Sequence, residues 1–309
     1  MADKKATRQG YGDGLVELGK KYDNLLVLEG DLGHATGTFA FRKAFPERHI
    51  EVGIAEQNLI GMAVGLSKVG FVPFATSFAV FSAGRAFEIV RNAVAYSHAN
   101  VKIVGSHSGV TPAGDGGTHQ CVEDIGAMRA LPNMTILSPC DYEQAKVLVE
   151  AAYHIDGPVY MRTSREPMPI VTQPGQAVEI GKAQKLREGG DLCVVSTGVM
   201  TPLSMEAAEV LAAEGIQATV LNLHTIKPLD TETIAETVRA CGGRLLVCEE
   251  CNRMGGIGEA IAYALLGAPV KMAHVAIEDR FGQSGQSAEV LAEYGVTVEN
   301  IVGKAKSLF

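Results

Sequence analysis

Positions 113–124, AGDGGTHQCVED, combine acids, a histidine and three glycines, which are residue types from which a site for a polar ligand can be built. Asp115 and His119 lie within this stretch, and His107 precedes it. Glycines allow the backbone to approach a ligand closely or to adopt positive φ. A lone histidine is more often structural, but three polar groups around one loop predict a substrate-facing site.

Two other interpretations of the same stretch are weaker. A nucleotide phosphate cradle needs G-x-G-x-x-G or a G-K-[ST] ending, and the stretch has neither. A GDG triplet also begins the motif with which thiamine-diphosphate enzymes hold a divalent metal, but that motif continues to an Asn. The corresponding window, 139–145, reads PCDYEQA and has no Asn. We therefore predict no metal ligand in this chain.

A carboxylate and two aromatic rings form the next candidate group. The run EVGIAEQN leads from an expected strand into an amphipathic helix, so that Glu56 falls in a first helical turn, where the helix dipole favours an acid. Such acids are common, and this position alone does not imply function. Further on, Phe78 and Phe81 stand three residues apart after a strand. They form either a core pair or the walls of a site for a flat heterocycle.

Composition restricts the class of protein. With 309 residues, 47% hydrophobic and 20% charged, the chain can form two α/β domains with separate cores. A net charge of −8 without a Lys/Arg-rich run argues against nucleic-acid binding. No apolar run approaches the roughly 20 residues that span a bilayer, and MADKKATRQG lacks the apolar centre of a signal peptide. We expect a cytoplasmic protein without membrane association.

The six cysteines predict buried thiols rather than a disulfide framework. Only CEEC, at 248–251, has the spacing of a metal or redox pair. A zinc site needs a second pair of ligands, and the sequence offers no matching local pair. A structural role for CEEC is therefore the better interpretation.

Short β-rich runs alternate with helical runs, which indicates mostly parallel sheets with helices on both faces. For the first half we expect strands at 24–30, 49–53, 71–76, 101–106, 134–139 and 158–163, with helices at 55–68, 82–97, 120–130 and 141–154. For the second half we expect strands at 191–198, 217–223, 243–250 and 270–277, with helices at 201–214, 231–240, 255–266, 286–293 and 297–306.

These elements predict two successive α/β domains, 1–172 and 191–309. The segment 173–190 is rich in Pro and Gly and predicts a linker with a short strand at its end. Open parallel sheets bind ligands at the carboxyl ends of their strands. In the first domain those ends carry Asp31, Glu51, Phe78, His107 and Arg165, together with Ser77.

The second domain lacks a comparable cluster. His224 and Lys227, in HTIKPLD, are interpreted as turn and strand-end residues with a role in subunit contact. We therefore expect the chemistry at the first sheet.

Five motifs in a fixed order carry a family resemblance: EVGIAEQN, FATSFAVF, GDGGTHQ, YMRTSR and HTIKPLD. With them the chain resembles the C-terminal part of transketolases over essentially its whole length. The resemblance implies a thiamine-diphosphate pyrimidine-binding domain at 1–172 and a transketolase C-terminal domain at 191–309. Full-length members begin with another domain, which binds the diphosphate and the metal.

The resemblance therefore implies a split transketolase. A separate N-terminal transketolase subunit would hold Mg²⁺ or Ca²⁺ and the diphosphate end of the cofactor, and this chain would bind the pyrimidine end. Because the active sites of the family lie between subunits, a homodimer core of this chain with two partner chains, α2β2, is expected.

The resemblance also implies which residues contact the cofactor. Glu56 resembles the glutamate that bonds N1′ of the aminopyrimidine, and such proton sharing is favoured in a dry pocket. Phe78 and Phe81 match the rings that pack around the aminopyrimidine. Asp31, in EGDLGHATG, resembles the acid near the thiazolium.

The substrate residues are also implied by the resemblance. His107 and His119 resemble the pair that contacts the donor's hydroxyls and the carbonyl oxygen where charge develops. Asp115 is similar to the acid that reads a substrate hydroxyl. Arg8 and Arg165 match phosphate clamps, because guanidinium groups fork onto phosphate oxygens.

The chain departs from the family pattern at two places. Many transketolases have a phosphate-binding serine after the Asp31 motif, whereas this chain reads His34, Ala35, Thr36. Either Thr36 or His34 substitutes, or the phosphate grip is weaker. Gly84 falls where some members have a tyrosine beside the cofactor.

The expected reaction is transfer of a two-carbon ketol unit from a ketose phosphate to an aldose phosphate, in the presence of the partner subunit. The alternatives with the same cofactor are 1-deoxyxylulose-5-phosphate synthase and the β subunit of a 2-oxo acid dehydrogenase (E1 beta), which decarboxylate a 2-oxo acid. The two histidines and the RTSR and TIKPLD runs favour transketolase. A non-catalytic regulatory subunit would have no need of Glu56, Asp115 and the histidine pair.

Overall fold

A seven-stranded sheet forms the centre of the first unit in the computed structural model, which describes residues 3–309. In spatial order its strands are β12 (Thr225–Lys227), β6 (Thr135–Leu137), β7 (Val159–Arg162), β5 (Lys102–Ser106), β4 (Val72–Phe78), β2 (Leu25–Glu29) and β3 (His49–Glu51). Every neighbouring pair is parallel except β12 with β6. The carboxyl ends of the six parallel strands therefore share one edge, where loops far apart in sequence meet.

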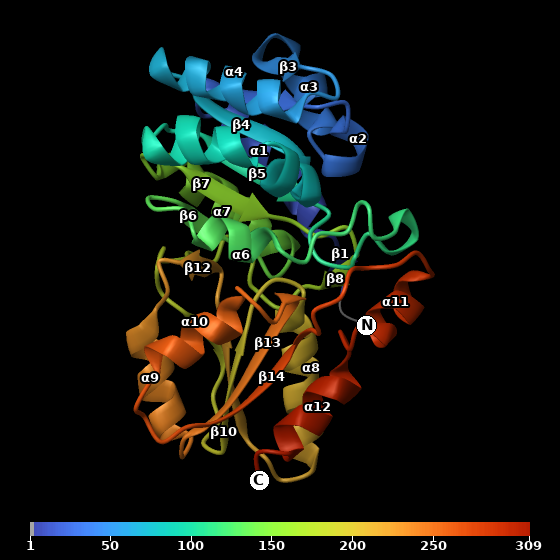
Figure 1. Ribbon diagram of the computed structural model, residues 1–309, viewed down its shortest axis with the longest axis vertical. Coiled ribbons are helices and arrows are strands. Elements are labelled where there is room, and N and C mark those ends of the chain that lie inside the picture. Colours follow the sequence, from blue (N-terminus) through green and yellow to red (C-terminus); the bar gives the residue numbers. More distant parts are fainter. Residues whose placement is uncertain (1–2) are drawn as a thin grey trace.

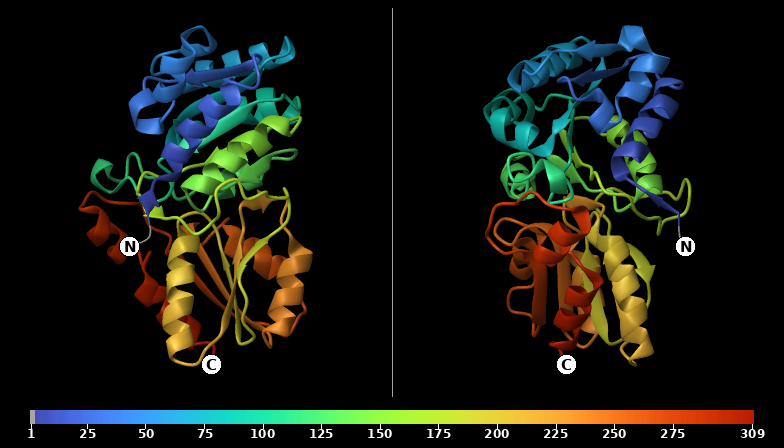
Figure 2. Two further views of the ribbon diagram at one scale, coloured as in Figure 1. Left: turned by 180° about the vertical axis from the view of Figure 1, so that it is seen from behind. Right: turned by 90° about the vertical axis from the view of Figure 1, so that its right-hand side faces the viewer.

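Helices cover both faces of this sheet because its strands are apolar on both sides. Leu26 and Leu28 of β2 face one apolar cluster, and Val27 between them faces another. The Val27 side is covered by α1 (Thr7–Gly19) and α7 (Tyr142–His154). The opposite side is covered by α4 (Glu56–Lys68), α6 (Asp124–Arg129) and a segment between β4 and β5. Figure 1 shows α4 on the near side, and Figure 2, from behind, shows α1 and α7 on the other.

The segment between β4 and β5 differs from the expected α-helix at 82–97. It consists of π-helical turns at Phe81–Arg85 and Val90–Tyr96 around a single α turn, α5 (Phe87–Ile89). Such π turns are rare and frequently occur at functional sites. Between β2 and β3 lie the short helices α2 (Gly33–Thr36) and α3 (Phe39–Ala44) and a 3₁₀ turn at Pro46–Arg48.

The second unit is a five-stranded sheet between two helical layers. Its spatial order is β14 (Lys271–Ile277), β13 (Arg244–Asn252), β10 (Leu192–Ser196), β11 (Ala218–Asn222) and β9 (Gln184–Arg187), parallel except for β9. On one face lie α8 (Met200–Ala213), α11 (Ser287–Glu293) and α12 (Val298–Lys306), and on the other α9 (Thr231–Ala240) and α10 (Ile257–Ala264). β9 is the short strand expected at the end of the linker.

The two units are joined by more than the linker. β12 comes from the second half of the sequence but pairs with β6 at the edge of the first sheet. His224, just before β12, accepts a hydrogen bond at its carbonyl from Ser138 N, and Lys227 Nζ donates to the carbonyl of Arg129. These residues thus join two units of one chain, rather than only ending a strand.

Near the N-terminus, β1 (Lys4–Lys5) pairs with β8 (Met168–Pro169).

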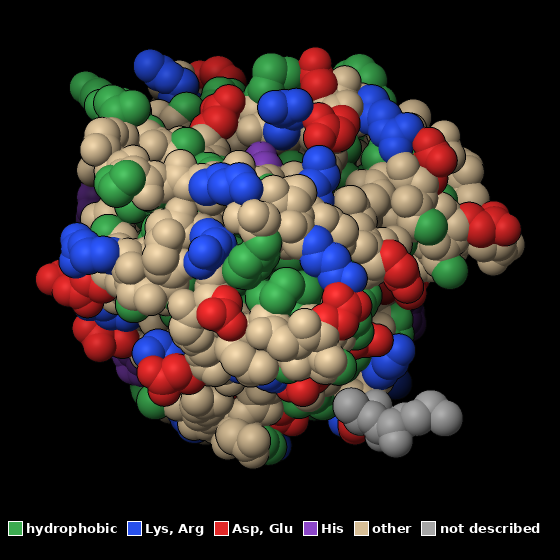
Figure 3. Space-filling view, turned by 90° about the horizontal axis from the view of Figure 1, so that it is seen from below, with side chains coloured by type: hydrophobic (Ala, Val, Ile, Leu, Met, Phe, Trp, Pro, Cys, Tyr) green, Lys and Arg blue, Asp and Glu red, His purple; other side chains and the backbone are tan. Residues whose placement is uncertain are grey.

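The cysteines are all buried and free. CEEC lies inside β13, and its two cysteines belong to different apolar clusters, Cys248 on one face of the sheet and Cys251 on the other. This placement does not form a metal or redox pair. Within residues 3–309, no group of three His, Cys, Asp or Glu side chains is arranged to hold a metal ion, and no helix has the length and apolarity needed to cross a membrane. On the lower face of the second unit, basic and acidic side chains are interspersed (Figure 3).

Candidate active site

A pocket of about 380 Å³ lies at the carboxyl edge of the first sheet. Its lining comes from the start of α1, the ends of β4 and β5, the loop that follows β5, and the segment after β7. The pocket contains six of the nine site residues predicted from the sequence, and its lining is Arg8, Ala35, Phe78, His107, Asp115, His119 and Arg165. Convergence of these residues follows from the topology, because parallel strands end at the same edge.

Stacked rings form one wall of the pocket. The Phe78 ring stacks on the His107 imidazole, with centroids 3.9 Å apart, and lies parallel to the Phe81 ring at 6.0 Å. His119 meets both phenyl rings edge-on. The arrangement is an apolar wall with two imidazoles along it, which fits a ligand that is flat at one end and polar at the other.

The His107 imidazole is held neutral. Its burial lowers its pKa to about 3, and the positive charges of Arg8 and Arg165 and the neighbouring His119 act in the same direction. Its Nδ1 lies 2.9 Å from the Ser106 hydroxyl, which fixes the plane of the ring. A neutral imidazole in this position can exchange hydrogen bonds with a hydroxyl or carbonyl group without carrying charge.

Three residues at this edge have a strained backbone. His107 has φ of 59° directly after β5, Ala113 has φ of 41° further along the same loop, and Asp31 has φ of 59° after β2. Positive φ is costly for residues with a β-carbon and tends to occur at functional sites. The strain therefore supports a functional assignment for these two loops.

Two guanidinium groups give the pocket an excess of positive charge. Arg165 Nη1 donates to Asp115 Oδ2 at 2.8 Å and to the carbonyl of Pro112 at 2.9 Å. Arg8 Nη1 donates to the carbonyl of Ala35 at 2.5 Å, while its buried Nε has no hydrogen-bond partner among the described residues. Burial and the proximity of Arg165 lower the pKa of Arg8. Two cations with one carboxylate leave a net attraction for an anion.

Glu56 lies in the first turn of α4, the helix that packs against the π-helical turn containing Phe81. The residue is 2% exposed, and its Oε2 has no hydrogen-bond partner within residues 3–309. The closest cation is Arg85, whose Nη1 is 3.5 Å from Oε2 and whose side chain is more than half exposed. A buried carboxylate oxygen with unused acceptor capacity is costly unless a ligand satisfies it. Such an atom fits the proton-bearing edge of a heterocycle.

Asp31 does not line the same pocket. It lines an adjoining one of about 210 Å³, which also contains His34 and shares Ala35 with the first. The backbone N–H of Asp31 donates to Glu51 Oε1 at 2.8 Å, which fixes the loop. Thr36 is fully buried and its hydroxyl donates to the carbonyl of Leu32, so that His34 rather than Thr36 reaches the pocket.

The remaining departure from the family pattern leaves room beside the site. A β-carbon added at Gly84 would contact nothing within 4 Å. The space that a larger side chain would fill is therefore open in this chain.

Sequence reasoning missed one buried acid of the second unit. Glu250, on β13, accepts hydrogen bonds at Oε1 from the backbone N–H groups of Val110 and Thr111, at 2.7 and 2.9 Å. These amides belong to the loop between His107 and Asp115. The signal in the sequence is an acid pair inside a buried β-rich run, although the flanking cysteines of CEEC have the spacing of a metal or redox pair.

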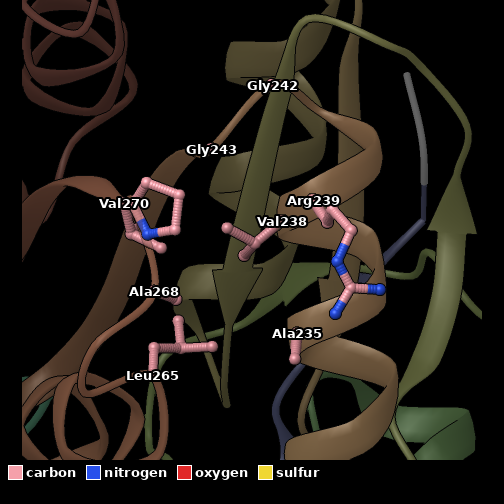
Figure 4. Close-up of a pocket in the computed structure, with 9 residues that line it drawn as sticks. Ala235, Val238, Arg239, Gly242, Gly243, Leu265, Ala268 and Val270 are labelled. Atoms are coloured by element: carbon pink, nitrogen blue, oxygen red, sulfur yellow. The ribbon is translucent and has the colours of Figure 1, made fainter.

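A second cavity, of about 460 Å³, lies at the far end of the second unit, between α9 and the turn before β14 (Figure 4). Arg239 is the only charged side chain among the residues that line it. Its other lining residues are small or apolar, among them Val238, Leu265 and Val270. Without converging polar groups this cavity is not a candidate for catalysis.

The fold and the site together define a two-unit α/β protein whose polar pocket lies at the carboxyl edge of the first sheet. The family model for the pyrimidine-binding domain of transketolase matches residues 3–170, and that for the transketolase C-terminal domain matches residues 181–301. The chain belongs to the transketolase family and corresponds to its C-terminal section.

Three relatives place the chain within the family. It is 43% identical to a putative transketolase C-terminal section of Methanocaldococcus jannaschii, over 96% of this chain and 94% of the relative. It is 38% identical to a 6-deoxy-6-sulfo-D-fructose transketolase subunit of a Clostridium species, over 96% and 92%. Human transketolase is 36% identical over the whole of this chain, which spans 50% of the human protein.

Among solved structures, one described as a split gene transketolase in an inactive beta4 tetramer superimposes with a TM-score of 0.89 at 42% identity, covering 98% of this chain and 97% of that one. The transketolase of Campylobacter jejuni shares the fold, with a TM-score of 0.84 at 23% identity over 99% of this chain and 47% of its own.

Proposed function

We propose that this chain is the C-terminal subunit of a thiamine-diphosphate-dependent transketolase, which transfers a two-carbon ketol unit from a ketose phosphate to an aldose phosphate. The observation that carries the proposal is the buried Oε2 of Glu56, which has no hydrogen-bond partner among residues 3–309 and lies on a helix packed beside the Phe81 turn. Together with the polar pocket behind Phe78, it provides one place for a heterocycle and another for a polyhydroxylated anion.

The cofactor residues act through position and exclusion of water. Thiamine diphosphate, when bound, supplies the nucleophilic carbon to which the ketol unit is attached. Glu56 holds a proton at N1′ of the aminopyrimidine, and its burial favours that hydrogen bond over solvation. Phe78 and Phe81 would hold the aminopyrimidine between apolar rings, and Asp31 would provide a carboxylate on the thiazolium side.

The pocket residues hold the sugar. His107 and His119 contact the donor's hydroxyls and the carbonyl oxygen, and the neutral form of His107 allows its ring to share a proton with that oxygen. Asp115 accepts a hydrogen bond from a substrate hydroxyl while Arg165 keeps its carboxylate oriented. Arg8 and Arg165 bind the terminal anion, since the unused Nε of Arg8 is a ready donor.

The remaining half of the enzyme comes from a partner. Human transketolase extends well beyond the portion that this chain matches, and one similar structure is described as an inactive tetramer of a single split-gene chain. We infer that an N-terminal subunit holds the divalent metal and the diphosphate, with this chain as a homodimer core in an α2β2 complex. In this assignment residues 1–172 bind the pyrimidine, 173–190 are the linker, and 191–309 are the C-terminal domain.

The anion of the substrate is either a phosphate or a sulfonate, because guanidinium groups bind both. One relative is named for 6-deoxy-6-sulfo-D-fructose, so phosphorylated and sulfonated sugars are both candidate substrates. The test is reconstitution with the N-terminal subunit, thiamine diphosphate and Mg²⁺. Transfer from xylulose 5-phosphate to ribose 5-phosphate is expected, and transfer only from the sulfosugar would overturn the phosphate assignment. Release of carbon dioxide from pyruvate would indicate a 2-oxo acid enzyme instead.

Glu56 provides the decisive variant. Glu56→Gln is expected to lower kcat by at least about 100-fold in the reconstituted complex, the scale of general acid–base catalysis. Unchanged cofactor-dependent turnover would refute the role. Glu17→Gln, on the exposed side of α1, is the control that should leave kcat unaltered.

A further inference from the structure

Glu250 belongs to the second unit, but its carboxylate is bonded to the first. The residue is 2% exposed on β13, and its Oε1 accepts the N–H groups of Val110 and Thr111 at 2.7 and 2.9 Å. Its own backbone carbonyl accepts a hydrogen bond from Arg162 Nη2 of β7 at 3.2 Å. Glu250 is therefore held against the first sheet through both its backbone and its side chain.

The two amides belong to a buried turn whose N–H groups are all accounted for. Ser108 N donates to the carbonyl of Thr163, and Gly109 N donates to the carbonyl of Cys121. The next two N–H groups, those of Val110 and Thr111, have the Glu250 carboxylate as their acceptor. Val110 and Thr111 are at most 1% exposed, so water cannot replace that acceptor without opening the turn.

The fit around the carboxylate is close. A β-carbon on Gly109 would lie 2.1 Å from Glu250 Cδ, and Gly109 has φ of 67°. Arg162 and Asp124 are charged neighbours of the Glu250 carboxylate, but they bond to each other through two hydrogen bonds. The hydrogen bonds that the carboxylate itself accepts come from the backbone N–H groups of Val110 and Thr111.

This turn connects the substrate-facing residues of the pocket. It begins after the strained His107 and leads into the loop that carries Asp115. The hydroxyl of Thr111 accepts a hydrogen bond from the backbone N–H of Arg165 at 3.4 Å. A displacement of Val110 and Thr111 would therefore move groups on both sides of the pocket.

We propose that Glu250 is a positioning residue, through which the second unit fixes the turn that carries the substrate-binding side of the pocket. The role depends on the reach of the side chain to the two amides and not on its charge. Its catalytic consequence rests on the transketolase function proposed above, whereas the structural role does not.

Two conservative variants distinguish the effect of the length of the Glu250 side chain from the effect of its charge. Glu250→Asp keeps the charge but withdraws the carboxylate by one methylene, and Glu250→Gln keeps an oxygen at Oε1 without the charge. Hydrogen exchange of the full chain, read by mass spectrometry, measures the opening of residues 108–111. We expect exchange of the Val110 and Thr111 amides to rise about tenfold or more in Glu250→Asp and to stay within about threefold of wild type in Glu250→Gln.

Glu249 is the matched control, since it is an equally buried acid on the same strand that bonds only within the second unit. Its carboxylate accepts the N–H groups of Ile257 and Gly258 and contacts His274. Glu249→Asp should speed exchange at those amides and leave residues 108–111 protected. Wild-type protection of 108–111 in Glu250→Asp, or equal loss of it in both Asp variants, would overturn the proposal.

The reconstituted enzyme supplies a second readout. Glu250→Asp is expected to lower kcat/KM for the ketose donor about tenfold, chiefly through KM, and Glu250→Gln to restore it to within about threefold. A fall in kcat alone, with unchanged KM, would contradict positioning of substrate groups. If wild-type complex shows no transfer, the proposed function fails, and the exchange experiment still decides the role of Glu250.

Discussion

At the scale of single residues, the pocket combines a cation that is already oriented with one that has an unused donor. Arg165 is bonded to Asp115 and Pro112, whereas Arg8 has a buried Nε without a partner among residues 3–309. The first arrangement fixes a plane for hydrogen bonding, and the second leaves a donor for the ligand. Both arrangements depend on the geometry of the guanidinium group. We therefore predict that a lysine cannot replace either arginine.

Arg165→Lys is expected to raise KM for phosphorylated substrates about tenfold, because an ammonium cannot bind a phosphate through two parallel N–H groups as a guanidinium can. Steady-state kinetics of the reconstituted complex measure this. Arg253→Lys is the control, because Arg253 forms a comparable pair with Glu278 on the surface of the second unit. Equal KM values for Arg165→Lys and wild type would contradict the assignment.

His107 predicts an absence of titration near neutral pH. Burial, Arg8 and Arg165 lower its pKa to about 3, so the imidazole remains neutral from about pH 4 upward. Its NMR resonances, assigned by their loss in His107→Asn, should not shift between pH 5 and pH 8. A titration midpoint near pH 6.5 would show that folding does not lower the pKa of His107.

At the scale of elements, the turn after β5 requires a glycine. Gly109→Ala places a β-carbon against the Glu250 carboxylate at φ of 67° and should lower the free energy of unfolding by about 2 kcal/mol or more. Gly303→Ala in α12, where a β-carbon meets nothing within 4 Å, should raise it by up to about 1 kcal/mol. Urea denaturation of both variants measures the contrast. A Gly109→Ala variant as stable as wild type would contradict the close packing of Gly109 against Glu250.

The strands and the pocket could largely be predicted because their signals are local. Buried parallel strands are continuous apolar runs, so 24–30 became β2, and polar groups just after such runs reach the carboxyl edge of the sheet. The pairing of β12 with β6 and the bond from Glu250 to Val110 could not be predicted. Both join segments far apart in sequence, and neither leaves a periodic pattern. The π-helical turns were missed because their apolar spacing resembles that of an α-helix.

At the scale of the whole molecule, the second unit is part of the scaffold of the pocket. One apolar cluster runs through both sheets, from Ile103 of β5 to Val247 of β13. The side-chain amide of Gln120, at the end of the loop 107–120, donates to the carbonyl of Gln283 before α11. A β-carbon on Gly116 would lie 2.3 Å from the Ser284 hydroxyl, so this loop fits closely against the second unit. Unfolding of the second unit should therefore remove the support of the loop 107–120.

The buried carboxyl group of Glu250 at this contact predicts a pH dependence of stability. Burial raises the pKa of Glu250 from 4.5 to about 7, although Arg162 and the two amides oppose the shift. Between these pH values the folded chain binds the proton more tightly than the unfolded chain does. The stabilising contribution of this group is therefore complete below about pH 4.5 and is lost as the pH rises through 7.

From pH 5 to pH 7 the loss should be on the order of 1–2 kcal/mol in wild type and absent in Glu250→Gln, which cannot ionise. The comparison of the two proteins isolates this term, because His107 and His224, with pKa values lowered by burial, contribute equally to the stability of both proteins and in the opposite direction. Urea midpoints at pH 5, 6 and 7 measure the difference. If the two proteins keep a constant difference in stability across this range, the pKa of Glu250 in the folded chain is not raised above that in the unfolded chain, and the contact between the units carries an ionised carboxylate at pH 7.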